Sequence, residues 1–276
     1  MSEDEKLSGF YTDMSNDEYH SNQSHYSSSV LKKALKGAQY FYDYVVAKVK
    51  EEEMPQDALD LGTYLHTAIL EPELLDSTTD VYPMRTRGKG FDAFKTENYG
   101  KTIITMAELE AAEEIINRFN TDFVDVGEAE DIPCKDLFKG GKAEESLFTR
   151  LDDTPIKVRF DYAIYRKDHI LIRDFKTCGG TANSESEADY ICKRLGYYIS
   201  AALYIDALRT ALPGLGYPVD TPIHFELIFA SKKDYNINIY RLSEETIEHG
   251  RQQYKKAIEL IKLWKRTNYR QGLRKL

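Results

Sequence analysis

The stretch "IRDFKTCGG", residues 172–180, places Asp174 and Lys176 two positions apart in an otherwise apolar run. The residues before it, "HIL" (169–171), are typical of a strand that enters this pair. Side chains two apart on a strand point to the same face, so both charges would project together from a buried strand. Burying them is costly unless they pair with each other or bind a metal ion. The pattern therefore indicates either an ion pair or a metal ligand beside a catalytic lysine.

A second carboxylate precedes this pair on a neighbouring predicted strand. Asp161 lies in "VRFDYAIY" (158–165), thirteen positions before Asp174, and "RKDH" (166–169) supplies a polar hairpin turn between the two strands. Pairing about that turn would bring both carboxylates to adjacent strands. Carboxylate oxygens are ligands that Mg²⁺ or Mn²⁺ prefers. Such an ion neutralises a phosphate and acidifies a bound water, which a lysine can orient or help deprotonate. This combination favours phosphodiester hydrolysis.

The rest of the chain alternates between helical and strand-like periodicity. Apolar residues at helical spacing predict helices, and alternating apolar residues predict strands. The predicted elements, in chain order, are helices beginning near 27 and at about 58–70 and 106–119, strands at 143–151, 156–165 and 169–177, a helix at 186–211, strands at 223–231 and 236–242, and a helix at 243–266. The stretch 83–101 is expected to be a surface loop. This order predicts an α/β fold with a central mixed β-sheet flanked by helices.

Length and composition are those of a globular protein. The chain has 276 residues, of which 42% are hydrophobic and 30% charged. We expect residues 1–25, which are polar and rich in Ser, Asn and Asp, to form a partly disordered segment. Residues 26–276 are expected to form a single domain. The sequence shows neither a signal-peptide apolar region nor a run long enough to span a membrane, so a cytoplasmic protein is expected.

Charge and cysteine content exclude several classes of protein. The three cysteines, at positions 134, 178 and 192, form no CxxC pair, which argues against a disulfide framework or a structural zinc site. They are also too few for a four-cysteine iron–sulfur cluster. The net charge of −9 argues against a protein that coats nucleic acid non-specifically. Residues 251–276 nevertheless carry nine Lys or Arg against one acid, Glu259. This end could hold DNA locally, or it could be a solvated helix face.

The spacing of Asp161 and the Asp174-Phe-Lys-Thr segment resembles the PD-(D/E)xK nuclease superfamily, which has a restriction-endonuclease-like core. Within it, the chain is similar to the RecE-type (exodeoxyribonuclease VIII-like) exonucleases of phage and prophage recombination systems. Three further stretches carry this resemblance: "EYHSNQSHYSSSVLKKAL" (18–35), "LDLGTYLHTAILEPE" (59–73), which contains a G-x-x-x-H pair at Gly62 and His66, and "GYYISAALYIDAL" (196–208).

The resemblance implies an activity, a cofactor and a set of site residues. It implies a Mg²⁺- or Mn²⁺-dependent exodeoxyribonuclease that degrades double-stranded DNA 5′→3′ and leaves 3′ overhangs for phage-type recombination by strand annealing. The implied metal ligands are His66, Asp161, Asp174 and the backbone carbonyl of Phe175, and Lys176 is the implied catalytic lysine beside the two aspartates. His66 could instead be a core histidine. Glu144 could bind the metal through water, or it could be an exposed strand residue.

Residues expected to hold DNA fall into two groups. Those of the first group begin a predicted helix, where free N–H groups favour a terminal 5′ phosphate, although an ordinary serine cap would look the same. Those of the second group could track or wedge the duplex from the 83–101 loop, which also has Lys89, Lys95, Phe91 and Phe94. The expected DNA or phosphate contacts are Ser28, Ser29, Lys32 and Lys33 in the first group, Arg85 and Arg87 in the second, and in addition Arg159 and Tyr204.

The chain departs from the family pattern at two places. Ser200 stands where the family has glutamine, while Tyr204 is kept, and Val158 and Phe160 replace a glycine-proline pair. The resemblance also implies double-stranded DNA ends and a single-strand annealing protein as partners, a homo-oligomeric ring (trimer or tetramer), and a phage or prophage protein in a bacterial cytoplasm. Two alternatives stay open: an endonuclease or single-strand nuclease of the same superfamily, and a catalytically impaired subunit that binds DNA ends.

Overall fold

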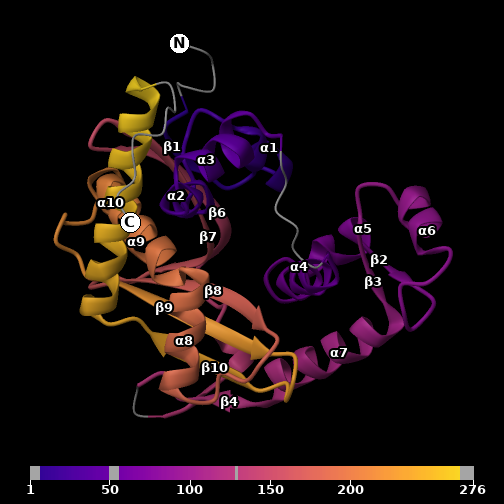
Figure 1. Cartoon of the computed structure of the whole chain (residues 1–276). Coiled ribbons are helices and arrows are strands. Elements are labelled where there is room, and N and C mark those ends of the chain that lie inside the picture. The colour runs from indigo at the N-terminus through magenta and orange to yellow at the C-terminus, as the bar shows by residue number, and fades with distance from the viewer. Residues whose placement is uncertain (1–6, 50–55, 128–129, 268–276) are drawn as a thin grey trace.

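A six-stranded mixed sheet forms the centre of the protein (Figure 1). The structure is a computed structural model that describes residues 7–49, 56–127 and 130–267. The strands lie in the order β1-β6-β7-β8-β9-β10, and all neighbours are antiparallel except β8 and β9. Their bounds are β1 Gly9–Tyr11, β6 Lys142–Leu151, β7 Thr154–Tyr165, β8 Ile170–Cys178, β9 Ile223–Ser231 and β10 Ile237–Arg241. The prediction of a mixed sheet flanked by helices is confirmed.

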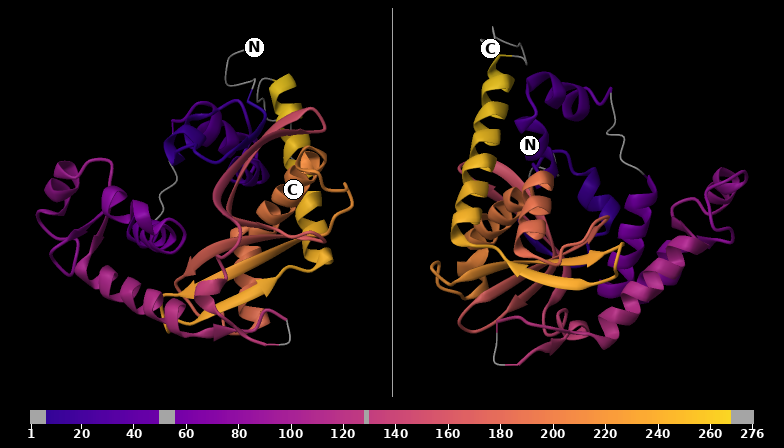
Figure 2. Two further views of the ribbon diagram at one scale, coloured as in Figure 1. Left: turned by 180° about the vertical axis from the view of Figure 1, so that it is seen from behind. Right: turned by 60° about the horizontal axis from the view of Figure 1, so that its bottom comes forward.

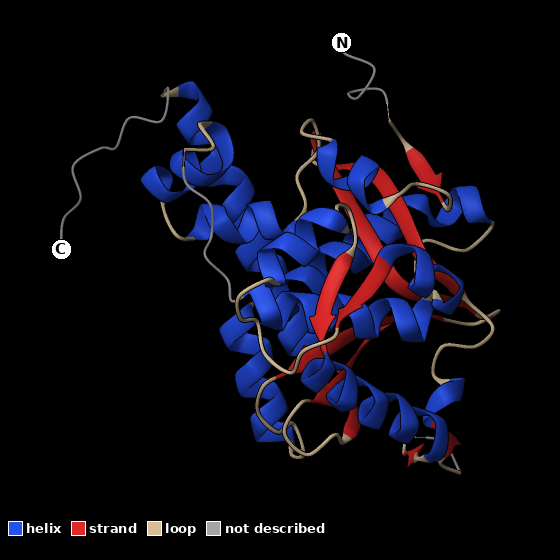
Figure 3. Ribbon diagram, turned by 90° about the vertical axis from the view of Figure 1, so that its right-hand side faces the viewer, coloured by secondary structure: helices blue, strands red, loops and turns tan. Residues whose placement is uncertain are grey.

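Helices cover both faces of this sheet (Figure 3). On one face, α2 (Ser28–Leu35), α9 (Tyr197–Ala211) and α10 (Glu244–Arg266) pack on Phe160, Ile172 and other buried side chains. On the opposite face, α4 (Gln56–Leu70) and α7 (Met106–Thr121) pack on Phe175 and its neighbours. Among the described helices, none combines the length and the hydropathy needed to cross a membrane.

Two helices predicted as continuous are divided at glycines. The predicted helix 186–211 is two helices, α8 (Glu185–Leu195) and α9, because Gly196 between them has a left-handed backbone with φ of 67°. The helix beginning near residue 27 ends at Leu35, and Gly37, with φ of 118°, separates it from α3 (Ala38–Phe41) and a π-helical turn, Tyr42–Val46. The apolar spacing continues across both glycines, which is why it predicted single helices.

Residues 56–121 form a branch that leads away from the sheet. Figure 2 shows α7 running from the sheet toward the outer end of this branch. Its remaining elements are η3 (Pro72–Leu74), α5 (Leu75–Thr78), the parallel strands β2 (Thr79–Tyr82) and β3 (Thr102–Thr105), and α6 (Phe91–Glu97). After the branch come β4 (Phe123–Val124), β5 (Ile132–Pro133) and η4 (Cys134–Asp136). The expectation of a loop at 83–101 is therefore wrong in part, since α6 lies within it and buries Phe91 against Tyr82.

The N-terminal segment contributes two short elements. Besides β1, it forms α1 (Asn16–Ser21), whose Ser15 and Glu18 make a capping box. Residues 1–6 of the segment predicted to be partly disordered lie outside the described residues. The division of the chain at residue 26 stays a prediction.

Gly250 lets α10 approach α9 closely. A Cβ atom at this position would stand 2.1 Å from the carbonyl oxygen of Tyr198 and 3.0 Å from Cβ of Ala202. Because a backbone carbonyl cannot move alone, we expect Gly250→Ala to lower the free energy of unfolding by about 1–3 kcal/mol in urea titrations. Gly214→Ala is the control, since no atom lies within 4 Å of its Cβ position, and it should change stability by less than about 0.5 kcal/mol. Equal urea midpoints for the two variants would contradict this packing argument.

Candidate metal centre

Two aspartates flank the point where β7 and β8 separate. The antiparallel ladder between these strands runs from Tyr165 opposite Ile170 to Tyr162 opposite Arg173, and ends there. Asp161 and Asp174 are the next residues on the two strands. The backbone N–H of Phe175 donates a hydrogen bond to Oδ2 of Asp161 at 2.9 Å. The carboxylate of Asp161 thus takes the place of a backbone acceptor. We call this point, where β7 and β8 separate at Asp161 and Asp174, the fork.

Lys176 bridges the two carboxylates. Its Nζ atom lies 2.7 Å from Oδ2 of Asp174 and 3.1 Å from Oδ2 of Asp161. It also donates to the backbone carbonyl of Phe175 at 3.1 Å. The predicted convergence of two aspartates and one lysine is therefore present at the fork, and so is the Phe175 carbonyl.

His66 reaches the same fork from α4. Its Nε2 atom lies 3.2 Å from Oδ2 of Asp161 and 3.5 Å from Oε1 of Glu144. One turn earlier, a Cβ atom at Gly62 would stand only 3.3 Å from Oγ1 of Thr177, so the glycine lets α4 pack closely against β8. This close approach accounts for the G-x-x-x-H spacing, because it brings the imidazole to the carboxylates.

Glu144, His66 and Asp161 together form a set of three side chains that could hold a metal ion. One ligand atom from each lies within 4.8 Å of the other two. Glu144 has a left-handed backbone with φ of 50°, and the β6–β7 ladder skips both Glu144 and Asp161. Its Oε1 atom is buried, and among the described residues no group hydrogen-bonds to it. A buried carboxylate oxygen without a donor, beside an imidazole and a second carboxylate, fits a divalent cation such as Mn²⁺ or Mg²⁺.

The charges at this centre shift several pKa values. Burial and the neighbouring Asp161 raise the pKa of Asp174 to about 6, and burial with the same aspartate raises that of Glu144 to about 7. Burial alone would raise the pKa of Asp161, but Lys176 and His66 outweigh it and hold that pKa well below its usual range. Burial opposes the charge of Lys176 too, yet the two aspartates raise its pKa. Carboxylates therefore crowd this site beyond what the lysine neutralises, and a divalent cation would relieve the excess.

The predicted DNA contacts are distributed unevenly around this centre. Lys32 of α2 lies close enough to Asp174 and Lys176 for their charges to shift its pKa, which burial lowers to about 8. The Ser28 hydroxyl hydrogen-bonds the phenol of Tyr204, which packs against Phe160 beneath α2. Ser28 and Lys32 thus lie on the side of α2 that faces α9, and Lys32 comes near the fork.

Three predicted cationic contacts have internal partners. Arg159 is buried, and its guanidinium donates to Oγ of Ser146 at 2.8 Å and to the Met14 carbonyl at 2.7 Å. Arg85 forms an exposed ion pair with Glu110. Arg87 pairs with Asp60 at 2.9 Å and Glu108 at 3.1 Å. Arg159 is therefore buried rather than a surface cation. Arg87 forms ion pairs that connect α4 with α7.

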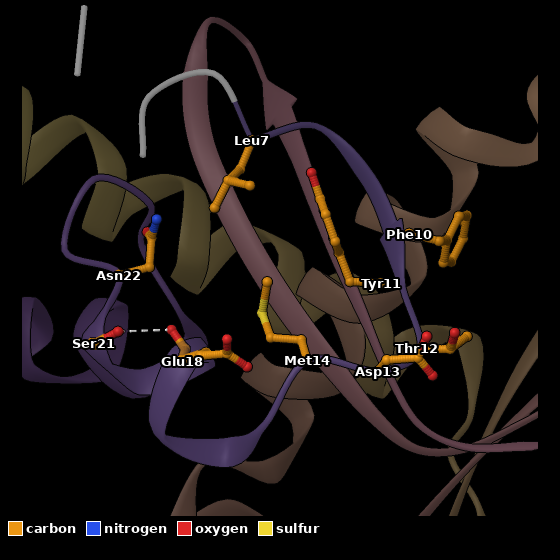
Figure 4. A pocket seen from close by; sticks show the side chains of 9 residues that line it. All are labelled: Leu7, Phe10, Tyr11, Thr12, Asp13, Met14, Glu18, Ser21 and Asn22. Carbon is orange, nitrogen blue, oxygen red and sulfur yellow. Dashed lines mark hydrogen bonds between the residues drawn. The ribbon is translucent and has the colours of Figure 1, made fainter. Parts of the chain in front are cut away.

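Two further features of the structure were not singled out from sequence. Tyr197 lies over the fork beside Lys176, on the helix that also carries the buried Ser200. Its spacing of seven residues from Tyr204, which places both on one helical face, could have signalled it. A cavity of about 530 Å³ lies elsewhere, against residues 7–22 of the N-terminal segment (Figure 4), and the three metal-binding side chains are not part of its lining.

Comparison with known proteins supports this arrangement at the level of family and fold. Residues 27–270 match a family model described as a PDDEXK-like domain of unknown function (DUF3799). The chain belongs to this family. The PDDEXK-like domain is also similar to a solved structure from Eubacterium rectale that is provisionally named an exonuclease, with a TM-score of 0.62 and 16% identity over 96% of each chain. This likeness shows the fold. The solved structure of SSO0001 has a TM-score of only 0.27 and 13% identity over 82% of this chain and 83% of its own, which is too low to indicate a shared fold. A search of the curated proteins found no match.

Metal binding should stabilise the PDDEXK-like domain. At a free Mn²⁺ or Mg²⁺ concentration of about one hundred times Kd, we expect Tm to rise by roughly 5–10 °C, because the folded state alone assembles the ligands. Asp161→Asn should abolish most of this rise in a thermal melt. The matched control is Asp152→Asn in the β6–β7 turn, where asparagine also tolerates the left-handed backbone, and it should keep the full rise. An equal rise in both variants would place the metal elsewhere.

Proposed function

We propose that the protein is a metal-dependent 5′→3′ double-strand DNA exonuclease that resembles the RecE-type enzymes. The observation that carries the proposal is the fork itself, where Lys176 bridges Asp161 and Asp174 while His66 contacts both Asp161 and Glu144. An ion pair alone would need one carboxylate, whereas here two aspartates contact Lys176 and a further carboxylate and an imidazole lie beside Asp161, which is a set suited to metal-dependent phosphodiester hydrolysis. The family match and the likeness to a structure provisionally named an exonuclease are consistent with it.

The proposed site residues divide into those that hold the metal and those that act on water and phosphate. His66, Asp161, Asp174 and Glu144 would hold the ion, together with the carbonyl of Phe175. When bound, a divalent cation supplies charge neutralisation at the phosphate and makes water more acidic. Lys176 keeps its ammonium at a fixed position between the two aspartates, from which it can orient the attacking water or donate to the phosphate. The hydrogen bond from Phe175 N–H holds the Asp161 carboxylate in place, while Lys176 and His66 keep its pKa low.

A terminal 5′ phosphate would be bound at the start of α2. Ser28, Ser29, Lys32 and Lys33 lie in its first two turns, where free N–H groups favour an anion. In the described part of the chain, no carboxylate lies within ion-pair distance of the Lys32 ammonium, so a phosphate could become its partner. Lys89 and Lys95, which lie on the branch, are exposed and could contact the phosphates of the duplex. Arg85 and Arg87 would first have to give up their carboxylate partners.

Digestion of end-labelled linear duplex DNA, with and without Mg²⁺, tests this proposal. We expect metal-dependent loss of nucleotides from the 5′ ends and no cutting of closed circular DNA. Cutting of circular DNA would indicate an endonuclease of the same superfamily instead. Retained binding to DNA ends without cleavage would indicate a catalytically impaired binding subunit.

The same resemblance leads us to propose a ring-shaped homo-oligomer, a trimer or tetramer, that passes the exposed 3′ strand to a single-strand annealing protein. A ring could keep the product strand threaded and so act processively. Native mass spectrometry of the full chain would give the number of subunits, and a monomer at micromolar concentration would refute the ring.

A further inference from the structure

Tyr197 brings an aromatic ring to two lysines of the site. It is the first residue of α9 and follows Gly196, which ends α8. The Nζ atom of Lys176 lies 5.8 Å from the centroid of its ring, and that of Lys32 lies 5.7 Å from it. Phe229 of β9 packs on the same ring at 6.2 Å between centroids.

The backbone before Tyr197 makes room for this arrangement. Gly196 has a left-handed backbone, and a Cβ atom there would stand 3.3 Å from Cε of Lys32. The glycine therefore serves two purposes, since it turns the chain from α8 into α9 and leaves space for the Lys32 stem. As a result, α2, β8 and α9 each place one side chain at this point, although these elements are far apart in sequence.

A neutral ring suits two neighbouring ammonium groups. The negative face of an aromatic ring attracts a cation, and partial burial strengthens the attraction. Lys176 already contacts Asp174 at 2.7 Å. A further carboxylate near the lysines would compete for the metal ion, whereas a phenol ring attracts both cations without adding negative charge. The charge of Lys176 acts unfavourably on Lys32, and a ring that faces both ammonium groups offsets part of this repulsion.

We infer that Tyr197 is a positioning residue, whose ring holds Lys176 at the metal centre and Lys32 toward the phosphate beside it. The inference rests on the proposed function and adds a residue that acts through the lysines. The ring, rather than the hydroxyl, has this role, so phenylalanine should replace tyrosine and an aliphatic side chain should not.

Steady-state digestion of linear duplex DNA by the full chain tests this role. Tyr197→Leu should lower kcat about tenfold and raise KM severalfold, since cation–π contacts of this kind are modest. Tyr197→Phe should restore kcat and KM to within about twofold of the wild type. The matched control is Tyr190→Leu, because Tyr190 is also a tyrosine under a cation, Arg194 at 5.5 Å, but is exposed on α8; it should leave both constants unchanged.

Two further measurements keep the test decisive if Tyr197→Leu folds poorly. Pentafluorophenylalanine at position 197 keeps the shape of the ring but reverses the charge of its face, so it should behave like leucine. In a Lys32→Ala/Lys176→Ala background, where both lysines are absent, Tyr197→Leu should not lower the residual kcat further, whereas a purely structural tyrosine would lower it again. Wild-type rates in Tyr197→Leu, or equal losses in the Phe and Leu variants, would overturn the inference.

A readout without DNA separates this inference from the proposed function. In protein labelled with ¹³C-lysine, the Cε resonances of Lys176 and Lys32 should carry ring-current shifts that disappear in Tyr197→Leu and persist in Tyr197→Phe. Unchanged resonances would overturn the role of Tyr197. Absence of digestion by the wild-type protein would overturn the proposed function, and the resonances would still decide whether Tyr197 holds the two lysines.

Discussion

Replacing Lys176 with alanine should lower kcat for DNA digestion by about 100- to 10,000-fold, the range for removal of a group that positions a proton or stabilises charge in the transition state. The reason lies in its contacts, because Nζ lies within 3.1 Å of both aspartates and so has a fixed position beside the metal-binding side chains. Single-turnover digestion of end-labelled duplex at saturating Mg²⁺ would measure this loss.

The same variant should bind the metal more tightly, which separates catalysis from metal binding. Without the ammonium, the carboxylates of Asp161 and Asp174 repel each other. A divalent cation would then be attracted by both carboxylates without competition from a lysine, so its affinity should rise. We therefore expect the metal-induced rise in Tm to be larger in Lys176→Ala than in the wild type. Lys193→Ala serves as the control, since that lysine forms an exposed pair with Asp189 on α8. A variant that loses both activity and the metal-induced rise would show that Lys176 merely maintains the structure of the site.

Removing the charge of Glu226 should destabilise the fold by about 3–5 kcal/mol, the usual cost of breaking a buried ion pair from one side. Its carboxylate is 2% exposed and accepts from Nε of Arg173 at 2.8 Å. Arg173 is itself buried on β8 and also donates to the carbonyl of Leu137. In Glu226→Gln the guanidinium would stay buried without a carboxylate, and a urea titration would report the lower free energy of unfolding.

Two comparisons define the origin of this effect. Arg241 also pairs with Glu226 at 2.6 Å, but its side chain is 48% exposed, so Arg241→Met should cost less than about 1 kcal/mol. The double variant Arg173→Met/Glu226→Leu replaces both charges with apolar groups and should recover most of the lost stability. If Glu226→Gln were no more destabilising than Arg241→Met, burial of the Arg173 charge would not be the cause.

The sheet and the convergence of Asp161, Asp174 and Lys176 could be predicted because their signals are local, whereas His66 and Glu144 were indicated only by the family resemblance. Alternating apolar residues identified the strands around the fork, and the spacing of Asp161, Asp174 and Lys176 indicated one shared face. The G-x-x-x-H pair gained its physical explanation from the structure, as Gly62 removes the side chain that would separate α4 from Thr177. The strand pattern and the spacing of the two aspartates and the lysine depend on neighbours within one or two elements, so the local sequence contains them.

Other features depend on contacts between distant segments, which a local pattern does not contain. Arg159 was expected at the DNA surface, yet the carbonyl of Met14 and the hydroxyl of Ser146 take its donors. Arg87 was expected to track the duplex, yet Asp60 pairs with it. The breaks at Gly37 and Gly196 were missed for a different reason, since the apolar spacing continues across each glycine while its left-handed backbone ends the helix.

The position of His66 on α4 has a mechanical consequence. His66 belongs to the branch formed by residues 56–121, whereas Asp161 and Asp174 belong to the central sheet. An ion shared between them would act as a cross-link that closes a long loop of chain. The chain entropy that such a link removes from the unfolded state grows only slowly with loop length and amounts to roughly 4.7 kcal/mol for a loop of about 100 residues. Chelation would then remove one link between the branch and the sheet, in addition to the packing of α4 and α7 on Phe175, so the cation would contribute to the stability of the fold as well as to the reaction.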